Sequence, residues 1–267
     1  MPAIQPVRLK KQASDLAAKF DQPAIFVREL RALLDQYTDY THRSGQAGEP
    51  HPLMSSYNTS PPVMRQVWVE LTRLTKTHQA NILPLCDALW AEPNYDLRLL
   101  AARLLGEVPI EPAGPVINRL QTWVHSGLEK RLLDGLLEHG LRQFQQQVPD
   151  QHLELVSAWL VSSDLSLQQA GLRALLPMIV STRSENLPTI FRLLTPLLRV
   201  APSRLRPDIL AALIALIHCS PSETAYLLRQ NLTAPDNPDT AWLTRQVLDE
   251  FPIETRAGLR ADLKRSI

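Results

Sequence analysis

The sequence contains little glycine and few aromatic residues. Its 267 residues include 9 Gly, 5 Phe and 5 Tyr against 47 Leu, and hydrophobic residues make up 45% of the chain. This composition favours helices over a β-sandwich or β-barrel. The apolar content is large enough for a sizeable core, which excludes disorder over the whole chain. The 22 prolines exclude one long coiled coil, because proline ends or kinks a helix, and they predict many short helices with prolines at the joints.

An excess of charge of one sign is also missing, as are long hydrophobic runs. The 28 Lys and Arg residues against 27 Asp and Glu leave a net charge of +1. No global positive field therefore draws the chain to DNA or to anionic lipid, and any nucleic-acid binding must come from a local patch. The longest uncharged apolar run, Ile209–Ile217, is too short to span a bilayer. No apolar stretch follows Lys10 and Lys11, so we expect no secretory signal and no contact with a membrane.

Residues that would carry metal or nucleotide chemistry are scarce. The two cysteines, Cys86 and Cys219, each lie in an apolar run, which predicts buried reduced thiols and a reducing, cytoplasmic location. None of the seven histidines pairs with a second His or a Cys at metal-ligand spacing. The chain has neither a glycine-rich phosphate loop nor a G-x-S-x-G turn. We therefore predict no metal site and no cofactor.

Helical periodicity and helix-boundary signals recur along the chain. The expected helices cover residues 62–77, 80–91, 95–107, 115–126, 128–146, 151–162, 165–181, 186–199, 203–218, 221–231, 238–250 and 254–264. Two consecutive helices take about 35–40 residues, the period of HEAT and armadillo repeats. The pattern predicts an all-α fold, an α-α superhelix (solenoid) of HEAT-like helical repeats. We expect a single domain over residues 1–267, with about six helix pairs and a polar loop at 41–61. A compact helical domain is the alternative.

Local signals place several helix starts. Asn94 is expected to cap the helix 95–107. Apolar residues recur at helical spacing in 95–108, at Leu97, Leu100, Ala101, Leu104, Leu105 and Val108, and in 203–218, at Leu205, Ile209, Leu210, Leu213, Ile214 and Ile217. Ser220 and Glu223 flank Pro221 in a capping-box pattern, and Asn237 with Pro238 is expected to begin the following helix. The polar residues Gln145, Gln146 and Gln147 end the expected helix 128–146 and face either phosphate or solvent.

Three stretches together resemble the HEAT-like alkylpurine DNA glycosylases, the AlkD-type DNA alkylation repair family. They are Asn58–Arg65, with a Pro-x-x-Arg helix start, Leu89–Ala101, which is the most specific, and Trp159–Ala170. The resemblance covers roughly residues 45–260. The family usually has glycine where Asn58 stands, and asparagine is the best substitute for glycine at positive φ. We interpret Trp90 and Trp159 as core residues packed between helices.

The resemblance implies a solenoid whose basic concave face holds double-stranded DNA. Enzymes of this family remove alkylated purines without drawing the base into a pocket, unlike glycosylases that flip the base. Aromatic side chains at the deoxyribose, an Asp and an Arg from a neighbouring helix carry out the reaction. These residue types suit the chemistry, because positive charge that develops on the sugar is stabilised by a carboxylate and by indole faces.

When the four catalytic residues of the family are compared with this sequence position by position, one of the four is present. Asp134 falls on the catalytic Asp and is the candidate catalytic residue. Lys130 and Ser166 stand where the family has tryptophans, and Gln169 stands where it has the Arg. A cation at Lys130 repels a developing positive charge or neutralises Asp134, one helical turn away. Asp134 is otherwise an ordinary carboxylate on a helix surface, and these replacements argue against an enzyme.

Basic residues remain in the helices that would form the inner row. The candidate DNA-binding residues are Arg98, Arg103, Lys130, Arg131, Arg142 and Arg173. Ordinary solvated helix charge, balanced by nearby carboxylates, is the alternative interpretation. Duplex binding requires that the positive charges be segregated on one surface, because affinity comes from phosphate neutralisation.

Three functions follow from these observations, in order of preference. The first is a DNA-binding paralogue of the alkylpurine DNA glycosylases, with reduced or absent base excision. The second is a helical-repeat scaffold that binds a protein partner. The third is an active glycosylase that uses Asp134. A shared fold alone does not decide among them, because function depends on the site.

Overall fold

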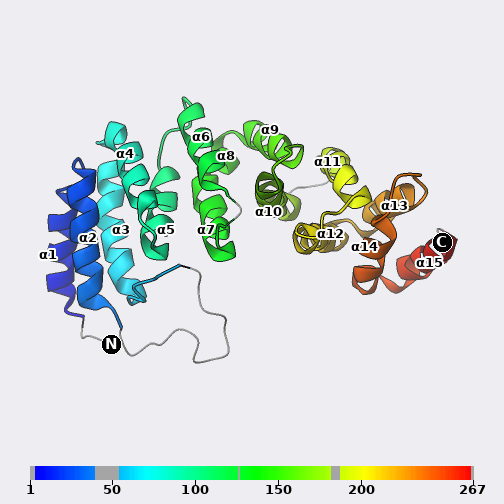
Figure 1. The fold of residues 1–267 in the computed structure, drawn as a ribbon, viewed down its shortest axis with the longest axis horizontal. Helices are drawn as coiled ribbons and strands as arrows, with labels where there is room; N and C mark the ends of the chain where they lie inside the picture. Colours follow the sequence, from blue (N-terminus) through cyan, green and yellow to red (C-terminus); the bar gives the residue numbers. More distant parts are fainter. Residues whose placement is uncertain (1–3, 40–53, 126, 182–186, 266–267) are drawn as a thin grey trace. The chain divides into compact units, whose positions relative to one another are not determined.

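The computed structural model describes residues 4–39, 54–125, 127–181 and 187–265, and the regular structure of these residues is helical apart from isolated bridges (Figure 1). They form the α-helices α1 to α15 and one short 3₁₀ helix, η2. Within the described ranges, extended pairing is limited to two isolated bridges, Thr38 with Thr59 and Ser55 with Asn94. The predicted all-α class, that of α-α superhelices built from HEAT-like repeats, is confirmed.

The first of two compact units contains residues 1–123 and 127–148. Its helices are α1 (Pro6–Ala17), α2 (Pro23–Tyr37), α3 (Pro61–Thr75), α4 (Gln79–Ala91), α5 (Tyr95–Leu105), α6 (Gly114–Trp123), α7 (Lys130–Gly140) and α8 (Arg142–Gln147). Alternate helices lie side by side, because α1 packs against α3, α2 against α4, and α5 against α7. This is the pattern of stacked helix pairs, in which each pair buries its apolar face against the next.

The second unit contains residues 124–126 and 149–267. Its helices are α9 (Pro149–Leu160), α10 (Leu165–Ser181), α11 (Leu187–Arg199), α12 (Arg206–Cys219), α13 (Pro221–Leu232), α14 (Thr240–Gln246), η2 (Leu248–Glu250) and α15 (Ile253–Arg265). Again alternate helices pack together, α10 on α12 and α13 on both α11 and α15. The expected single domain over 1–267 stays a prediction.

Helical periodicity identified the buried positions of α5 correctly. Its predicted core residues, Leu97, Leu100, Ala101, Leu104 and Leu105, are all buried, as is Val108 beyond the end of the helix. In the expected helix 203–218 the pattern was less accurate, since Leu210 and Ile214 are only half-buried. Cys86 is buried as expected, and burial raises the pKa of its thiol. Cys219 is exposed, so the prediction of a buried thiol was wrong at that position.

Several helix boundaries differ from the prediction. The expected helix 128–146 divides into α7 and α8 at Gly140, where a Cβ would lie 2.9 Å from Leu120 Cδ2. The helices α1 and α2 were missed, although Pro6 and Pro23 begin them. Proline also lies inside α4, α10 and α11, at Pro84, Pro177 and Pro196. Loss of one backbone hydrogen bond is tolerated where packing holds the helix on both sides of the proline.

The capping signals had mixed outcomes. Asn94 caps α5 as predicted, because its Oδ1 accepts from the backbone N–H of Asp96 at 2.9 Å and of Leu97 at 3.3 Å. At α13 the Ser220 hydroxyl donates to the Glu223 carboxylate and makes no hydrogen bond to a helix N–H. The helix α14 begins at Thr240, two residues after Pro238, because Asn237 instead donates to the carbonyl of Asn231.

The expected polar loop at 41–61 lies mostly outside the described residues, which resume at Met54. Its last part holds the start of α3 against α5, since the Asp96 carboxylate accepts from the Ser56 hydroxyl at 2.9 Å and from the Tyr57 N–H at 2.7 Å. Asn58 has a φ of 49°. The positive φ expected at this position is therefore confirmed, and it explains why asparagine can replace glycine in this turn.

Candidate functional site

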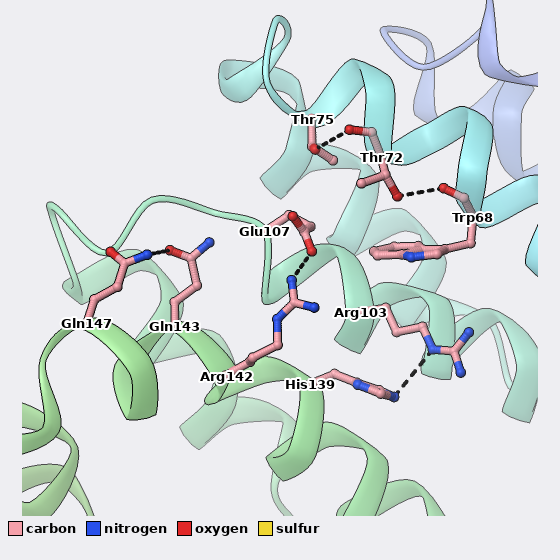
Figure 2. Close-up of polar contacts among 9 residues, drawn as sticks. All are labelled: Trp68, Thr72, Thr75, Arg103, Glu107, His139, Arg142, Gln143 and Gln147. Atoms are coloured by element: carbon pink, nitrogen blue, oxygen red, sulfur yellow. Dashed lines mark hydrogen bonds and ion pairs between the residues drawn. The ribbon is translucent and has the colours of Figure 1, made fainter.

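Polar side chains from four helices of the first unit converge on one surface, which we call the polar face (Figure 2). It consists of Trp68 and Thr72 on α3, Arg103 on α5, His139 on α7 and Arg142 on α8. The stacking of α5 on α7 brings Arg103 beside His139 across 36 residues of sequence. Two of the six predicted DNA-binding residues, Arg103 and Arg142, thus lie on the same surface.

Arg103 and His139 form a hydrogen-bonded pair. Arg103 Nε donates to His139 Nε2 at 3.3 Å, so this ring nitrogen acts as an acceptor. Burial lowers the pKa of His139, and the charge of Arg103 lowers it further. The imidazole is therefore neutral near pH 7, and Arg103 keeps its positive charge and four further N–H donors.

Arg142 is tied to the neighbouring helix through an ion pair. Its Nη2 contacts Glu107 Oε1, just beyond the end of α5. The Arg142 side chain is 45% exposed, whereas that of Glu107 is 17% exposed. The cation thus projects toward solvent while the carboxylate is largely covered.

A hollow of about 480 Å³ adjoins the polar face near the ends of α3, α5 and α8. Glu107, the partner of Arg142, is part of its wall. Three glutamines line it, Gln79, Gln143 and Gln147, and Gln147 Nε2 donates to Gln143 Oε1 at 3.2 Å. Of the three glutamines singled out in the sequence, Gln147 therefore faces this hollow.

A second group of predicted cations lies at the other ends of α5 and α7, close to their N-termini. Arg131 covers the ring of Tyr95 at 5.0 Å. Arg98 Nε donates to the carbonyls of Trp90 and Glu92, both at 2.9 Å, and burial lowers the pKa of its guanidinium. Lys130 is exposed. Arg98 therefore satisfies backbone carbonyl groups at the C-terminal end of α4, while Arg131 and Lys130 are exposed to solvent.

The candidate catalytic residue Asp134 lies on the exposed side of α7, one turn after Lys130. An exposed carboxylate is well solvated, so it stabilises a developing cation less than a buried carboxylate does. Its catalytic role stays a prediction, as does the role of the six cations in DNA binding.

The other two replaced pocket positions, Ser166 and Gln169, belong to α10 in the second unit. Gln169 Nε2 donates to Asp208 Oδ2 at 2.7 Å, and Asp208 Oδ1 pairs with Arg173 at 2.9 Å. The side chains of Arg173 and Asp208 are each 8% exposed. Arg204 reaches the Ser166 hydroxyl at 3.4 Å. Arg204 itself is exposed. We call Ser166, Arg173, Asp208 and the half-buried Gln169 the buried cluster, and in it Arg173 joins α10 to α12.

The tryptophans of the resembling stretches are core residues, as predicted. Trp90 stacks on Trp123 with ring centroids 4.2 Å apart and an interplanar angle of 6°. Trp159 is 1% exposed. Neither ring presents a face to a bound sugar, in contrast to Trp68, which is half-exposed on the polar face.

Sequence reasoning missed part of the polar face and most of the hollow. Trp68, Thr72 and Thr75 recur at i, i+4 and i+7, which places an aromatic and two hydroxyl groups on one side of α3. His139, Arg142 and Gln143 have similar spacing across the α7–α8 junction. Polar residues at this spacing, on helices that are otherwise apolar, were the sequence signal that could have identified the polar face. The sequence contains no comparable signal for Glu107 as a lining residue of the hollow, since its place there depends on how α5 packs near α8.

These stacked helix pairs define a HEAT-like repeat protein. Among the described residues, no group of three or more His, Cys, Asp or Glu side chains is placed to hold a metal ion. A sequence model of the family described as DNA alkylation repair enzyme matches residues 51–207, more than half of the chain. The chain belongs to this family. The resemblance seen in the sequence is thereby confirmed.

Other comparisons add little. No curated protein matches the chain. The crystal structure of an engineered protein is 16% identical, and the match covers 99% of this chain and 79% of that chain with a TM-score of 0.36. That likeness is too low to bear on fold or function. Among the described residues, no helix is long and apolar enough to cross a membrane.

Proposed function

We propose that this member of the DNA alkylation repair family binds double-stranded DNA through the first unit and has reduced or absent base-excision activity. The observation that supports binding is the convergence of Arg103 and Arg142 beside Trp68 on the polar face. Each guanidinium keeps N–H donors that its intramolecular partner does not use, and phosphate oxygens accept such donors readily.

The replaced pocket supports the loss of excision. Lys130 and Asp134 are exposed on α7, and Trp90 and Trp159 are packed in the core. Gln169, which stands where the family has an arginine, instead holds Asp208. Excision needs groups that stabilise positive charge on the sugar, and here one exposed carboxylate remains beside a lysine.

The first test is a salt-titrated binding assay with a fluorescein-labelled duplex. Each of Arg103→Gln and Arg142→Gln is expected to weaken binding several-fold and to reduce the salt slope by about one, as for loss of one phosphate contact. Arg119→Gln is the matched control, because Arg119 is also ion-paired, to Asp87 at 2.6 Å, but belongs to α6. Equal losses in all three variants would contradict an interface on the polar face.

The second test is base release from methylated duplex DNA. We expect no release above the uncatalysed rate. Release that disappears in Asp134→Asn would instead establish an active glycosylase that uses this carboxylate.

A protein-binding scaffold is the second candidate function. It is favoured by the mixed charge near the polar face, where Lys76 lies in the same hollow as Glu107 and Glu111. Absence of duplex binding at low salt would favour this function, because phosphate contacts are strongest there.

A further inference from the structure

His139 gives the polar face a side chain whose charge changes near neutral pH. Its ring points toward Arg103 (Figure 2), and its Nε2 accepts from Arg103 Nε at 3.3 Å. Only a neutral imidazole has a lone pair for this contact, because both ring nitrogens of the imidazolium carry a proton. The hydrogen bond between the two residues therefore exists in one protonation state of His139 and is lost in the other.

The charged groups around His139 come from the helices that pack against α7, namely α5, α6 and α8. Arg103 on α5 and Arg142 on α8 oppose protonation of the imidazole, whereas Glu138 on α7 itself favours it. The cation of α6, Arg119, is held in an ion pair with α4. Burial and the two arginines together lower the pKa of His139. In the free chain the imidazole is therefore neutral near pH 7.

A phosphate group bound at Arg103 reverses this balance, because a nearby negative charge favours the protonated imidazole. Once His139 Nε2 carries a proton, it stops accepting from Arg103 and becomes a donor. Arg103 Nε, which loses its acceptor, is then also available. These two nitrogens lie 3.3 Å apart, so both can donate to the oxygens of one phosphate group in charge-assisted hydrogen bonds.

We infer that His139 takes up a proton when the polar face binds a duplex, so that DNA binding tightens as the pH falls. This inference rests on the proposed function and adds the regulation of the same site. The proton comes from the solvent and is released again when the DNA leaves. The additional affinity is present at low pH and is lost as the pH rises through the pKa that His139 has in the complex.

The test is the salt-titrated binding assay with the labelled duplex at about pH 5.5 and about pH 7.5, the range in which histidine changes its charge. We expect about tenfold tighter binding at the lower pH, near the lower range of one hydrogen bond to a charged group. The salt slope should be steeper by about one, because one further phosphate is neutralised. If His139 merely held Arg103 in place, binding would instead weaken at the lower pH. The buried His152, whose pKa is about 4, stays neutral at both values.

His139→Gln keeps an acceptor for Arg103 but takes up no proton, so both the tightening and the steeper salt slope should disappear. His218→Gln is the matched control, because His218 is also near a charged side chain, Glu250 at 3.4 Å, but belongs to α12 of the second unit. It should retain both effects. Calorimetry in two buffers of different ionisation enthalpy should detect proton uptake on binding in the wild-type chain and none in His139→Gln.

Arg103→Gln provides a second variant should His139→Gln fail to fold. Loss of this cation removes opposition to protonation, so the tightening should begin at a higher pH than in the wild-type chain. Equal affinity of the wild-type chain at both pH values, or a pH dependence that survives in His139→Gln, overturns the inference. Failure to bind the duplex at either pH overturns the proposed function itself.

Discussion

The polar face of the first unit and the buried cluster of the second contain the same types of side chain, but these side chains differ in their exposure to solvent. Each contains an arginine paired with a carboxylate from a neighbouring element, Arg142 with Glu107 and Arg173 with Asp208. The Arg142 side chain is 45% exposed, whereas that of Arg173 is 8% exposed. Arg142 can add a phosphate to its contacts, while the buried Arg173 is held within the packing of α10 on α12.

This difference shows why a count of basic residues is a poor measure of DNA binding. A buried cation is desolvated and depends on its counter-charge, so it contributes to the integrity of the fold. An exposed pair contributes little to stability and leaves donors for a ligand. Of the six predicted DNA-binding residues, Arg173 is therefore the weakest candidate for phosphate contact.

The largest expected effect comes from breaking the buried cluster. Asp208→Asn removes the negative charge beside Arg173 and is expected to lower the unfolding free energy by about 3–5 kcal/mol, the usual cost of leaving one partner of a buried pair uncompensated. Chemical denaturation followed by circular dichroism measures this loss. Hydrogen exchange should place the loss in α10 and α12.

The double variant Arg173→Met with Asp208→Leu sharpens this prediction. Replacing a buried pair by apolar side chains is often neutral or stabilising, so the double variant should recover much of the lost stability. If Asp208→Asn is as stable as the wild-type chain, Asp208 does not hold a buried cation.

Acid should also destabilise the second unit through His152 on α9. This side chain is 1% exposed, and burial lowers its pKa to about 4. The unfolded chain binds a proton near pH 6.5, whereas the folded chain does not, so stability is complete above about pH 6.5 and falls as the pH approaches 4. The loss at pH 4 is about 3 kcal/mol, from 1.36 kcal/mol per pKa unit. Urea denaturation at a series of pH values measures it.

His139 on the polar face gives a contrast within the same titration. Its pKa is also lowered, by burial and by Arg103, so protonation again opposes folding as the pH falls. It is only half-buried, however, and solvent reduces the effect. His152→Leu should therefore flatten the pH dependence more than His139→Gln does. The reverse order would show that the polar face controls acid stability.

The sequence predicted the elements that depend on local chemistry. Periodicity found the core of α5, and the cap at Asn94 and the positive φ of Asn58 follow from side chains within a few residues. The division between α7 and α8 was not predictable in this way. It occurs where Gly140 approaches Leu120 of α6, a contact between residues 20 positions apart.

The candidate site was predictable only as a set of residue types. Arg103 and Arg142 were identified from the sequence, but their partners His139 and Glu107 lie 36 and 35 residues away. The hydrogen-bond partner of Gln169 could not be deduced from the sequence either, because this partner, Asp208, lies on α12. Periodicity shows which side of a helix is polar, whereas the packing of one helix on another decides which polar groups meet.

A smaller effect is expected where backbones approach closely beneath the polar face. A Cβ on Gly106 would lie 2.1 Å from the His139 carbonyl oxygen, so Gly106→Ala must push α5 away from α7. Overpacking of this kind costs about 1–3 kcal/mol. The same substitution should also weaken duplex binding, because it separates Arg103 from His139. Thermal unfolding and the binding assay measure the two effects.

Gly171→Ala is the counterpart in the second unit. There the added Cβ would meet Leu160 Cγ at 3.0 Å and the Leu160 backbone nitrogen at 3.3 Å, less closely than the Cβ at Gly106 meets its neighbour. We expect a loss near the lower end of the about 1–3 kcal/mol that overpacking costs, and no change in duplex binding. An equal loss of duplex binding in both glycine variants would contradict the assignment of the interface to the polar face.

The smallest effect on stability is expected at the ion pair of the polar face itself. Glu107→Gln removes the partner of Arg142, and because the Arg142 side chain is 45% exposed to solvent, we expect the pair to contribute only about 0–1 kcal/mol. Unlike Asp208→Asn, this variant should unfold at nearly the wild-type denaturant concentration. It should nevertheless bind duplex DNA more tightly and with a steeper salt dependence, because Arg142 no longer shares its charge with a carboxylate. A chain that loses stability without gaining affinity would show that this pair, like that of Arg173, serves the fold.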